Sequence, residues 1–408
     1  MIGAAGIDLL STAAIRDPHT PLRRMREQDE VLWSTRHKCW VLTGHAAVDA
    51  AFRDKRLSAA RGMAAFRSRL QKRHADLVRN ALELLDGWML FNDPPAHTRL
   101  RDPVRRAFSL RVVQALAPRI EQRVGVLLDA CDAETDLVSG FAQPLTAGII
   151  GDLLGIDDEA RAFVHQWTRD FGQLIYGVSS REDGFATAIA RAGDEFRARM
   201  APLIEAQEAA VDGNLIARVK AASQAFDWTP SELLGAVSML LFAGHDTTSA
   251  LIASATRVAA GDARVREALR GDEASAASAV EELLRIEGPS KTFVRVAPDA
   301  HERGGHHIAA GDTLWLSVLG ANRDPNVFAA PDIIDPARDP NPHLGFGGGI
   351  HFCLGAALAR LEARIALGSL WRRFPDLRIA VADSALRWHP GVVDRSLVAL
   401  PVQLNRAT

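Results

Sequence analysis

The chain has 408 residues and a net charge of −2 at pH 7, with 48% hydrophobic and 24% charged residues. This length suits two average domains or one large one, and the composition is typical of a soluble globular protein. The charge balance gives no reason to expect binding to nucleic acid or to a membrane surface. The three cysteines, at positions 39, 131 and 353, are odd in number and far apart, which argues against a disulfide framework and fits a reducing compartment.

The N-terminal stretch from Met1 to Ile15 is mildly apolar, but Asp8, Ser11 and Thr12 interrupt it. It has no basic n-region and no cleavage pattern, so we expect neither a signal peptide nor a membrane span. A cytoplasmic protein is therefore expected. Because no repeats, low-complexity segments or long linkers follow, we expect a single domain over residues 1–408.

Most of the chain has the pattern of helices, and only a few short segments have that of strands. These segments are too few and too scattered for a doubly wound sheet. We therefore predict a mainly helical fold of the α+β class with small peripheral sheets. The expected strands lie at 31–33, 39–42, 314–318 and 397–402.

His97 and Arg101 stand four residues apart in a segment that reads DPPAHTRLR. On a helix, this spacing places both side chains on one face. By itself the pattern is explained equally well by a basic stripe on the surface.

A long buried helix is predicted from about residue 230 to about residue 260. Thr229, Pro230 and Glu232 form a capping box at its start, and few charged residues follow. Inside it, four polar residues from His245 to Thr248 interrupt the apolar run. Buried polar groups are costly unless they are used, so this interruption indicates a functional site. The alternative is a kink at a glycine, with a solvated polar turn.

Glu282 and Arg285 form an acid–base pair three residues apart. Such pairs are common on helix surfaces, so the residues alone favour an ordinary solvated pair.

The most informative segment runs from Phe346 to Gly355 and reads FGGGIHFCLG. Its glycines let the backbone adopt positive φ and pass close to a flat ligand. A helix is expected just after Cys353, which places the thiol at the positive end of the helix dipole and favours a thiolate. With no second cysteine nearby, this suggests a single metal ligand, and haem iron is one metal that accepts a lone cysteine.

Other ligand-binding motifs do not match the spacing of the residues in this segment. A G-x-G-x-x-G fingerprint would need a glycine where Ile350 or Phe352 stands, and a phosphate loop would need Gly-Lys-Ser/Thr. A zinc site would need more ligands than His351 nearby. A buried structural cysteine is the remaining alternative.

The segment resembles the haem-binding signature of the cytochrome P450 family, F-G-x-G-x-H/R-x-C-x-G, with every fixed position filled. The resemblance implies that Cys353 is the proximal ligand of haem b and that Gly355 belongs to the same site. It also implies that Phe346 packs by the thiolate and that His351 meets a haem propionate. The implied fold is a single P450 domain of about a dozen helices, with haem between the long buried helix and the helix after the cysteine.

The interrupted helix carries a second similar motif, A-G-x-D/E-T-T, which begins at Ala243 and Gly244. These small residues share a face with Thr247 and would leave room for O₂ and substrate. The resemblance implies that Thr247 hydrogen-bonds the bound dioxygen or nearby waters, and that Asp246 relays protons for O–O cleavage. His245 occupies the variable position and receives no role.

The DPPAHTRLR segment is also similar to a family element, so His97 and Arg101 are implied partners of a propionate. Arg295 matches the family's strand arginine and is implied to have the same role. Charged partners of this kind suit buried carboxylates.

Glu282 and Arg285 resemble the family's structural E-x-x-R pair. The basic residue that the family usually adds to this network is missing, because Ile333 occupies its position. Arg338 is close enough in sequence to be a substitute.

The resemblance implies a soluble, bacterial-type, monomeric monooxygenase that oxidises a small, largely apolar molecule in secondary metabolism or catabolism. The chain shows no flavin or iron–sulfur motif, so electrons from NAD(P)H are expected through a separate ferredoxin and ferredoxin reductase. Arginines on two helices are proposed to dock the ferredoxin: Arg105, Arg106, Arg111, Arg360 and Arg364.

Two rival functions stay open at this point. One is oxidative coupling or dehydrogenation of a carrier- or peptide-bound substrate; the less favoured one is a haem sensor without turnover. The substrate itself is not identified. Its pocket is expected to include Trp88, Phe91, Leu240, Ala243, Thr292, Phe293 and Val294.

Overall fold

The computed structural model describes residues 3–405 except 63, 65–75, 158, 160–162, 165, 169–170 and 172–183. The described residues are mainly helical with short strands, as the sequence predicts. They divide into two compact units. Unit one comprises Met1–Leu57, Ala117–Leu145 and Thr247–Thr408, and unit two comprises Ser58–Leu116 and Thr146–Asp246.

Unit one contains a four-stranded sheet in the order β1, β2, β7, β4. β1 (Val31–Ser34) is antiparallel to β2 (Cys39–Leu42), and β2 is parallel to β7 (Thr313–Ser317). β4 (Thr292–Val296) pairs antiparallel with the other side of β7. Three of these strands lie within one residue of the strands predicted at 31–33, 39–42 and 314–318.

The predicted strand at 397–402 forms only at its end. β9 (Pro401–Gln403) lies between β3 (Glu134–Asp136) and β8 (Arg378–Ile379) in an antiparallel sheet. The backbone N–H of Leu400 instead donates to the Asp136 carboxylate at 2.7 Å, so pairing starts one residue later. A separate hairpin joins β5 (His301–Arg303) to β6 (His306–Ile308).

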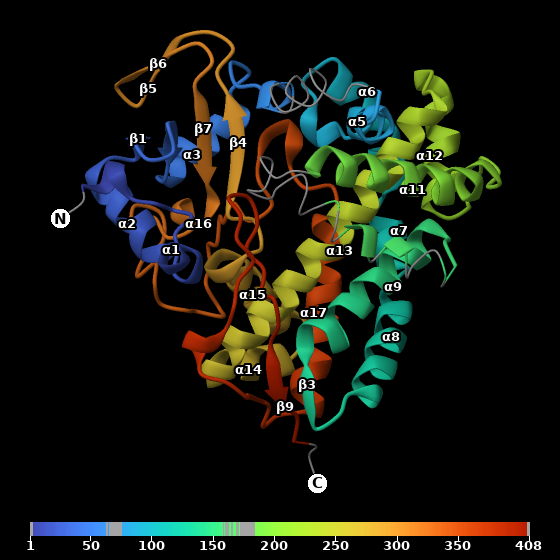
Figure 1. Cartoon of the computed structure of the whole chain (residues 1–408). Helices are drawn as coiled ribbons and strands as arrows, with labels where there is room; N and C mark the ends of the chain where they lie inside the picture. Colours follow the sequence, from blue (N-terminus) through green and yellow to red (C-terminus); the bar gives the residue numbers. More distant parts are fainter. Residues whose placement is uncertain are drawn as a thin grey trace. The chain divides into compact units, whose positions relative to one another are not determined.

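Helices supply most of the remaining described structure (Figure 1). α9 (Gln143–Leu154) and α13 (Pro230–Gly261) each contain residues of both units. The other helices of unit one are α1 (Thr12–Arg16), α2 (His19–Gln28), α3 (His45–Arg53), α8 (Ala117–Ala130), α14 (Ala263–Arg270), α15 (Glu273–Glu287), α16 (Val318–Ala321) and α17 (Ala356–Arg373). Those of unit two are α5 (Arg79–Asp86), α6 (Ala96–Ala107), α7 (Leu110–Gln114), α11 (Phe185–Glu205) and α12 (Leu215–Ser223).

α13 begins where its capping box predicts. The backbone N–H of Glu232 donates to the Thr229 hydroxyl at 3.2 Å, and the Glu232 carboxylate accepts from the Thr229 N–H at 2.9 Å. Among the described residues, α13 alone is long and apolar enough to cross a membrane. However, 67% of its apolar window is buried inside the protein, as in many core helices.

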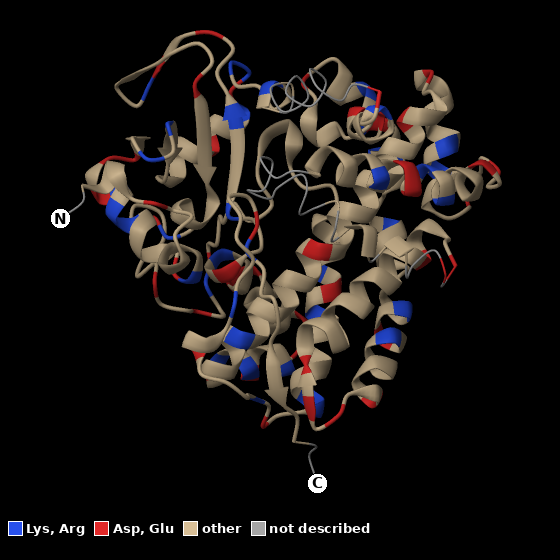
Figure 2. Ribbon diagram, viewed as in Figure 1, with Lys and Arg blue, Asp and Glu red and all other residues tan. Residues whose placement is uncertain are grey.

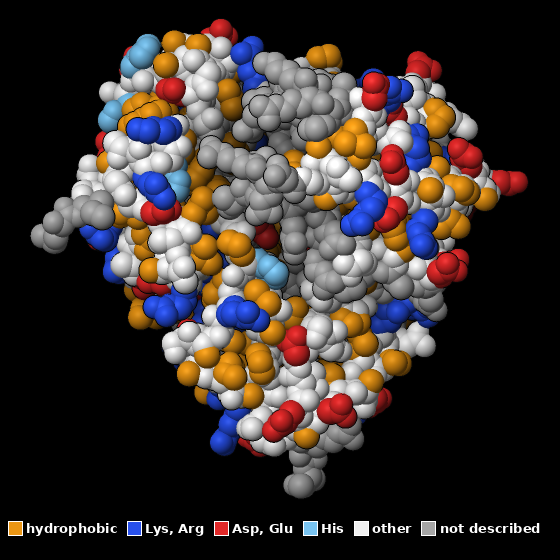
Figure 3. Space-filling view, in the orientation of Figure 1, with side chains coloured by type: hydrophobic (Ala, Val, Ile, Leu, Met, Phe, Trp, Pro, Cys, Tyr) orange, Lys and Arg blue, Asp and Glu red, His pale blue; other side chains and the backbone are white. Residues whose placement is uncertain are grey.

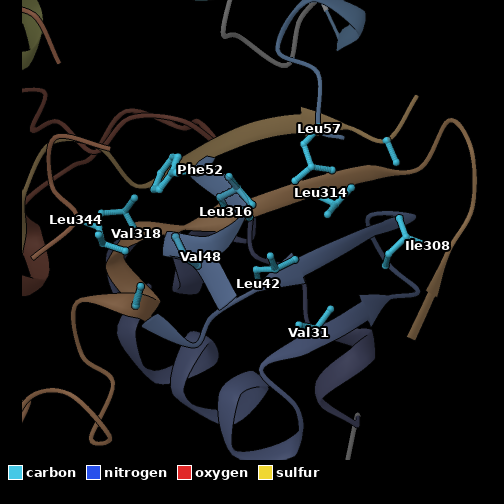
Figure 4. Close-up of a cluster of buried hydrophobic side chains, with 13 residues drawn as sticks. Val31, Leu42, Val48, Phe52, Leu57, Ile308, Leu314, Leu316, Val318 and Leu344 are labelled. Carbon is cyan, nitrogen blue, oxygen red and sulfur yellow. The ribbon is translucent and has the colours of Figure 1, made fainter. Parts of the chain in front are cut away.

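A buried apolar cluster lies against the four-stranded sheet (Figure 4). Leu314 and Leu316 on β7 point into it, as the two-residue period of a strand requires, and Phe52 of α3 packs against them. Trp315 points to the opposite face, onto a second cluster. Leu344 also belongs to the first cluster, so the chain is anchored there shortly before it reaches Cys353.

Basic and acidic side chains are interspersed over the described part of the face shown (Figure 2; Figure 3). This distribution agrees with the small net charge of the chain.

Candidate functional site

The loop from Phe346 to Gly355 presents the thiol of Cys353 just before α17. Gly347 and Gly349 adopt positive φ values of 69° and 62°, which glycine tolerates best. The backbone N–H of Cys353 donates to the carbonyl of Phe346 at 3.0 Å and closes the loop. Because α17 begins at Ala356, the exposed thiol lies near the positive end of its dipole.

The loop also lies against the end of α3. A Cβ atom on Gly349 would come within 2.2 Å of the Phe52 carbonyl oxygen, and one on Gly348 within 3.0 Å of the Phe52 side chain. The ring of Phe52 meets that of Phe293 on β4 edge-on, with centroids 5.3 Å apart. The glycines thus permit a backbone approach that fixes the loop against α3 and β4.

Replacing Gly349 with alanine is expected to destabilise the protein by about 3 kcal/mol, because strain at positive φ adds to a clash with the backbone. Gly305 is a matched control, since it has a φ of 78° and open space around it. Gly305→Ala should therefore cost only about 1 kcal/mol. Urea unfolding measures both variants, and equal losses would show that the approach to α3 contributes nothing.

Phe346 is held by a charged cluster on α15 and α17. The guanidinium of Arg360 lies 4.3 Å from the Phe346 ring centroid, within range of a cation–π contact. Arg360 also donates to the Glu281 carboxylate at 2.7 and 2.8 Å, and His343 lies 2.9 Å from the same carboxylate. Burial raises the pKa of Glu281, but the hydrogen bonds from Arg360 and His343 outweigh burial and lower the pKa to about 2.

The low pKa of Glu281 predicts a pH-dependent contribution to stability. The carboxylate is stabilised by folding, so its contribution is complete above the unfolded-state pKa and is lost as pH falls toward about 2. The difference in unfolding free energy between wild type and Glu281→Gln should therefore shrink progressively below about pH 5. In an Arg360→Gln background the same comparison should depend less on pH. A difference that stays constant from neutral to acid pH would contradict the assignment.

Glu282 and Arg285 are completely buried, unlike the solvated pair that their spacing alone favours. Arg285 donates to both carboxylate oxygens of Glu282, at 2.7 and 2.8 Å. Arg338 adds a third member, because its Nε lies 3.2 Å from the Glu282 carboxylate. Ile333 contributes only its carbonyl oxygen, which accepts from Arg285 and Arg338. Its side chain is 56% exposed.

The residues expected to bind propionates lie on both units. In unit one, Arg295 is buried on β4, two residues after the Phe293 ring that faces the cysteine loop, and His351 ends the short helix Gly349–His351. In unit two, His97 and Arg101 lie one turn apart on α6, as predicted, with His97 almost completely buried.

The polar segment of α13 is helical and not a turn, because the helix continues through it. Leu240, Ala243 and Thr247 lie on its accessible face, whereas Thr248 and Ser249 are buried. His245, which the sequence left without a role, is also completely buried. Gly244 differs from expectation: a Cβ there would lie 3.0 Å from Ile150 of α9. Its small size thus serves helix packing as well.

The residues expected to line the substrate pocket differ in how deeply they are buried. Trp88 is completely buried, its indole N–H donates to Ser238 at 2.8 Å, and Phe91 stacks on its ring. Trp88 is thus packed in the core of unit two, and its role in a substrate pocket stays a prediction. Thr292 is buried as well. The partly exposed candidates are Phe91, Leu240, Phe293 and Val294.

The arginines expected to dock a ferredoxin are partly engaged within the protein. Arg360 pairs with Glu281, Arg364 with Glu273 at 3.0 Å, and Arg105 with Asp102 at 3.5 Å. Arg106 lies over an aromatic ring, and Arg111 is exposed.

Comparison with known proteins gives one consistent result. Residues 275–377 match a family model described as cytochrome P450. Over 97% of its length the chain is 37% identical to cytochrome P450 107B1 of Saccharopolyspora erythraea, covering 98% of that protein. It is 35% identical to the cytochrome P450 monooxygenase PikC of Streptomyces venezuelae, with 99% of this chain and 94% of that protein covered. A solved structure of P450BioI, in complex with acyl carrier protein ligated to hexadec-9Z-enoic acid, matches with a TM-score of 0.87 at 29% identity, covering 97% of this chain and 100% of that one.

Proposed function

The chain belongs to the cytochrome P450 family and is a monooxygenase that uses haem and O₂, and from this premise we propose that Cys353 is its haem ligand. We propose a small, largely apolar organic substrate from secondary metabolism or catabolism. The observation that carries the ligand assignment is the geometry of the cysteine loop, which presents an exposed thiol at the start of α17.

The residues present fit a haem. A lone soft thiolate suits haem iron, whose family members use this ligand. The loop supports this assignment through its glycines, since Gly347 and Gly349 adopt positive φ and so present the Cys353 thiol just before α17. Haem bound through this thiolate supplies the chemistry of O₂ activation.

The protein's own contribution is binding, orientation and proton delivery. We propose that His97, Arg101, Arg295 and His351 bind the propionates, since buried carboxylates need charge-assisted partners. Asp246 and Thr247 hold and pass protons at the accessible face of α13, where Ala243 leaves space for small ligands. Leu240, Phe293 and Val294 supply apolar surface toward the substrate.

Replacing Thr247 with alanine is expected to lower the product formed per NAD(P)H by roughly tenfold, because positioned proton transfer normally contributes about 100-fold or more and water replaces the hydroxyl only in part. The missing reducing equivalents should appear as hydrogen peroxide, which a coupled peroxidase assay measures. Thr247→Ser keeps the hydroxyl and should stay near wild type. Fully coupled turnover in the alanine variant would refute the proton-delivery role.

Electrons are proposed to come from NAD(P)H through a separate ferredoxin and its reductase, with the chain acting as a single-domain, cytoplasmic monomer. Arg106 and Arg111 are the best candidates for ferredoxin docking, because Arg105, Arg360 and Arg364 lie beside carboxylates of this chain. Electrostatic steering by such residues raises association rates most at low salt.

A second candidate function is oxidative coupling or dehydrogenation of a carrier-bound substrate. It is favoured by the structural relative that was solved with a fatty acid on acyl carrier protein. Mass spectrometry of the product separates the two functions, since hydroxylation adds one oxygen and dehydrogenation or coupling removes two hydrogens. Substrates for this assay are best found by a spectroscopic screen for spin-state shifts, run with free acids and with carrier-bound acids.

A further inference from the structure

A buried histidine next to the acid–alcohol pair connects α13 to α9. His245 is completely buried, and its Nδ1 lies 2.9 Å from the hydroxyl oxygen of Thr146, which is also completely buried. Its Nε2 lies 3.6 Å from a carboxylate oxygen of Asp246. One turn further along α9, Ile150 packs against Gly244, so the two helices are in contact at two successive residues of α13. Each imidazole nitrogen thus faces a polar group.

These contacts select the form of the imidazole. A neutral imidazole has one N–H and one lone pair. A lone pair on Nε2 would face the carboxylate oxygen of Asp246 and repel it, whereas an N–H there attracts it. Nε2 therefore carries the proton in the neutral form. The Thr146 hydroxyl can donate or accept, so in that form it donates to Nδ1 and stabilises the tautomer that the carboxylate favours.

We propose that His245 is a positioning residue for proton delivery, which holds the Asp246 carboxylate in place while the Thr146 hydroxyl holds the imidazole ring of His245. This inference rests on the proposed roles of Asp246 and Thr247. The 3.6 Å separation exceeds a hydrogen bond, so the attraction is electrostatic.

Two matched pairs of variants test the proposal. Thr146→Val removes the hydroxyl at nearly constant volume, and Thr146→Ser restores it. His245→Leu removes both nitrogens, and His245→Gln keeps a donor amide. The valine and leucine variants are expected to lower product per NAD(P)H by about tenfold, as loss of supporting hydrogen bonds does at other sites, while substrate affinity from spin-state titration stays constant. Serine and glutamine should recover most of the coupling.

A second readout does not depend on turnover. Long-range ¹H–¹⁵N spectra of histidine-labelled protein, as the diamagnetic reduced carbon monoxide complex, report the tautomer, with His245→Gln providing the assignment. We expect a protonated Nε2 in wild type and in Thr146→Ser, and a changed Nδ1 signal in Thr146→Val. A histidine protonated only at Nδ1 would overturn the proposal, as would valine and leucine variants that stay coupled.

Asp246→Asn distinguishes the positioning role of His245 from the proton-delivery role of Asp246 on which it rests. If Asp246→Asn stays fully coupled, the proton-delivery role itself fails, and with it the role of His245. If Asp246→Asn uncouples but the Thr146 and His245 variants do not, the positioning role alone is wrong. Should His245→Leu fail to fold, the Thr146 pair decides the question by itself.

Discussion

Replacing Cys353 with histidine is expected to abolish the strongly red-shifted Soret band of the reduced carbon monoxide complex. That band depends on thiolate ligation, and an imidazole is a neutral and weaker electron donor to iron. Monooxygenase turnover should fall by about 100-fold or more, since even outer partners of a metal ligand often contribute 10- to 100-fold. An absorption spectrum of the purified variant is sufficient to check this, and an unchanged band would refute the assignment of Cys353.

The other two cysteines provide the controls. Cys39 is buried on β2, and burial raises the pKa of its thiol to about 12, so it stays protonated and is no thiolate ligand. Cys131 is half-buried, and burial also raises the pKa of its thiol. Cys131→Ser should therefore keep both the red-shifted Soret band and the monooxygenase turnover. This result would show that their loss is specific to replacement of Cys353.

Removing Arg285 is expected to produce the largest loss of stability. Arg285→Met would leave the buried carboxylate of Glu282 without its main partner and the carbonyls of Asn322 and Pro331 without the hydrogen bonds that Arg285 donates. Breaking a buried ion pair from one side typically costs about 3–5 kcal/mol. Chemical denaturation of the haem-loaded protein, followed by circular dichroism, measures the loss.

A double variant tests whether the loss of stability comes from the carboxylate that Arg285→Met leaves without its main partner. Glu282→Leu combined with Arg285→Met removes both charges, so it should be less destabilising than Arg285→Met alone. Arg378→Met, on the exposed surface of β8, should change stability by less than about 0.5 kcal/mol. If Arg285→Met behaved like the surface control, the network would have no structural role.

The features predicted correctly from the sequence are local ones. The capping box at Thr229 fixes the start of α13 through contacts three residues apart, and the helix after Cys353 follows from its composition. The spacing of His97 and Arg101 likewise places them one turn apart on α6. In each case the signal and the structure lie within a few residues of each other, so no tertiary information is needed.

The features that the residues alone did not predict, apart from the family resemblance, depend on distant contacts. Glu282 and Arg285 look like a solvated pair until the fold buries them, and Arg338 reaches them across more than fifty residues. Trp88 is enclosed by partners far along the chain, so its burial was not predictable. The polar run included His245 in a site but gave it no role, because its partner on α9 lies 99 residues away in sequence.

The hydrogen-bond network around Glu282 contacts Ile333 through its main-chain carbonyl and not through its side chain. The network therefore depends on the path of the backbone at position 333 and makes no use of the side chain there. A basic residue introduced at position 333 should not add stability, because Arg338 already pairs with the Glu282 carboxylate. The two basic side chains would compete for the same acceptor. Compensation of this kind lets a sequence pattern disappear from one position while the interaction that it describes persists from another.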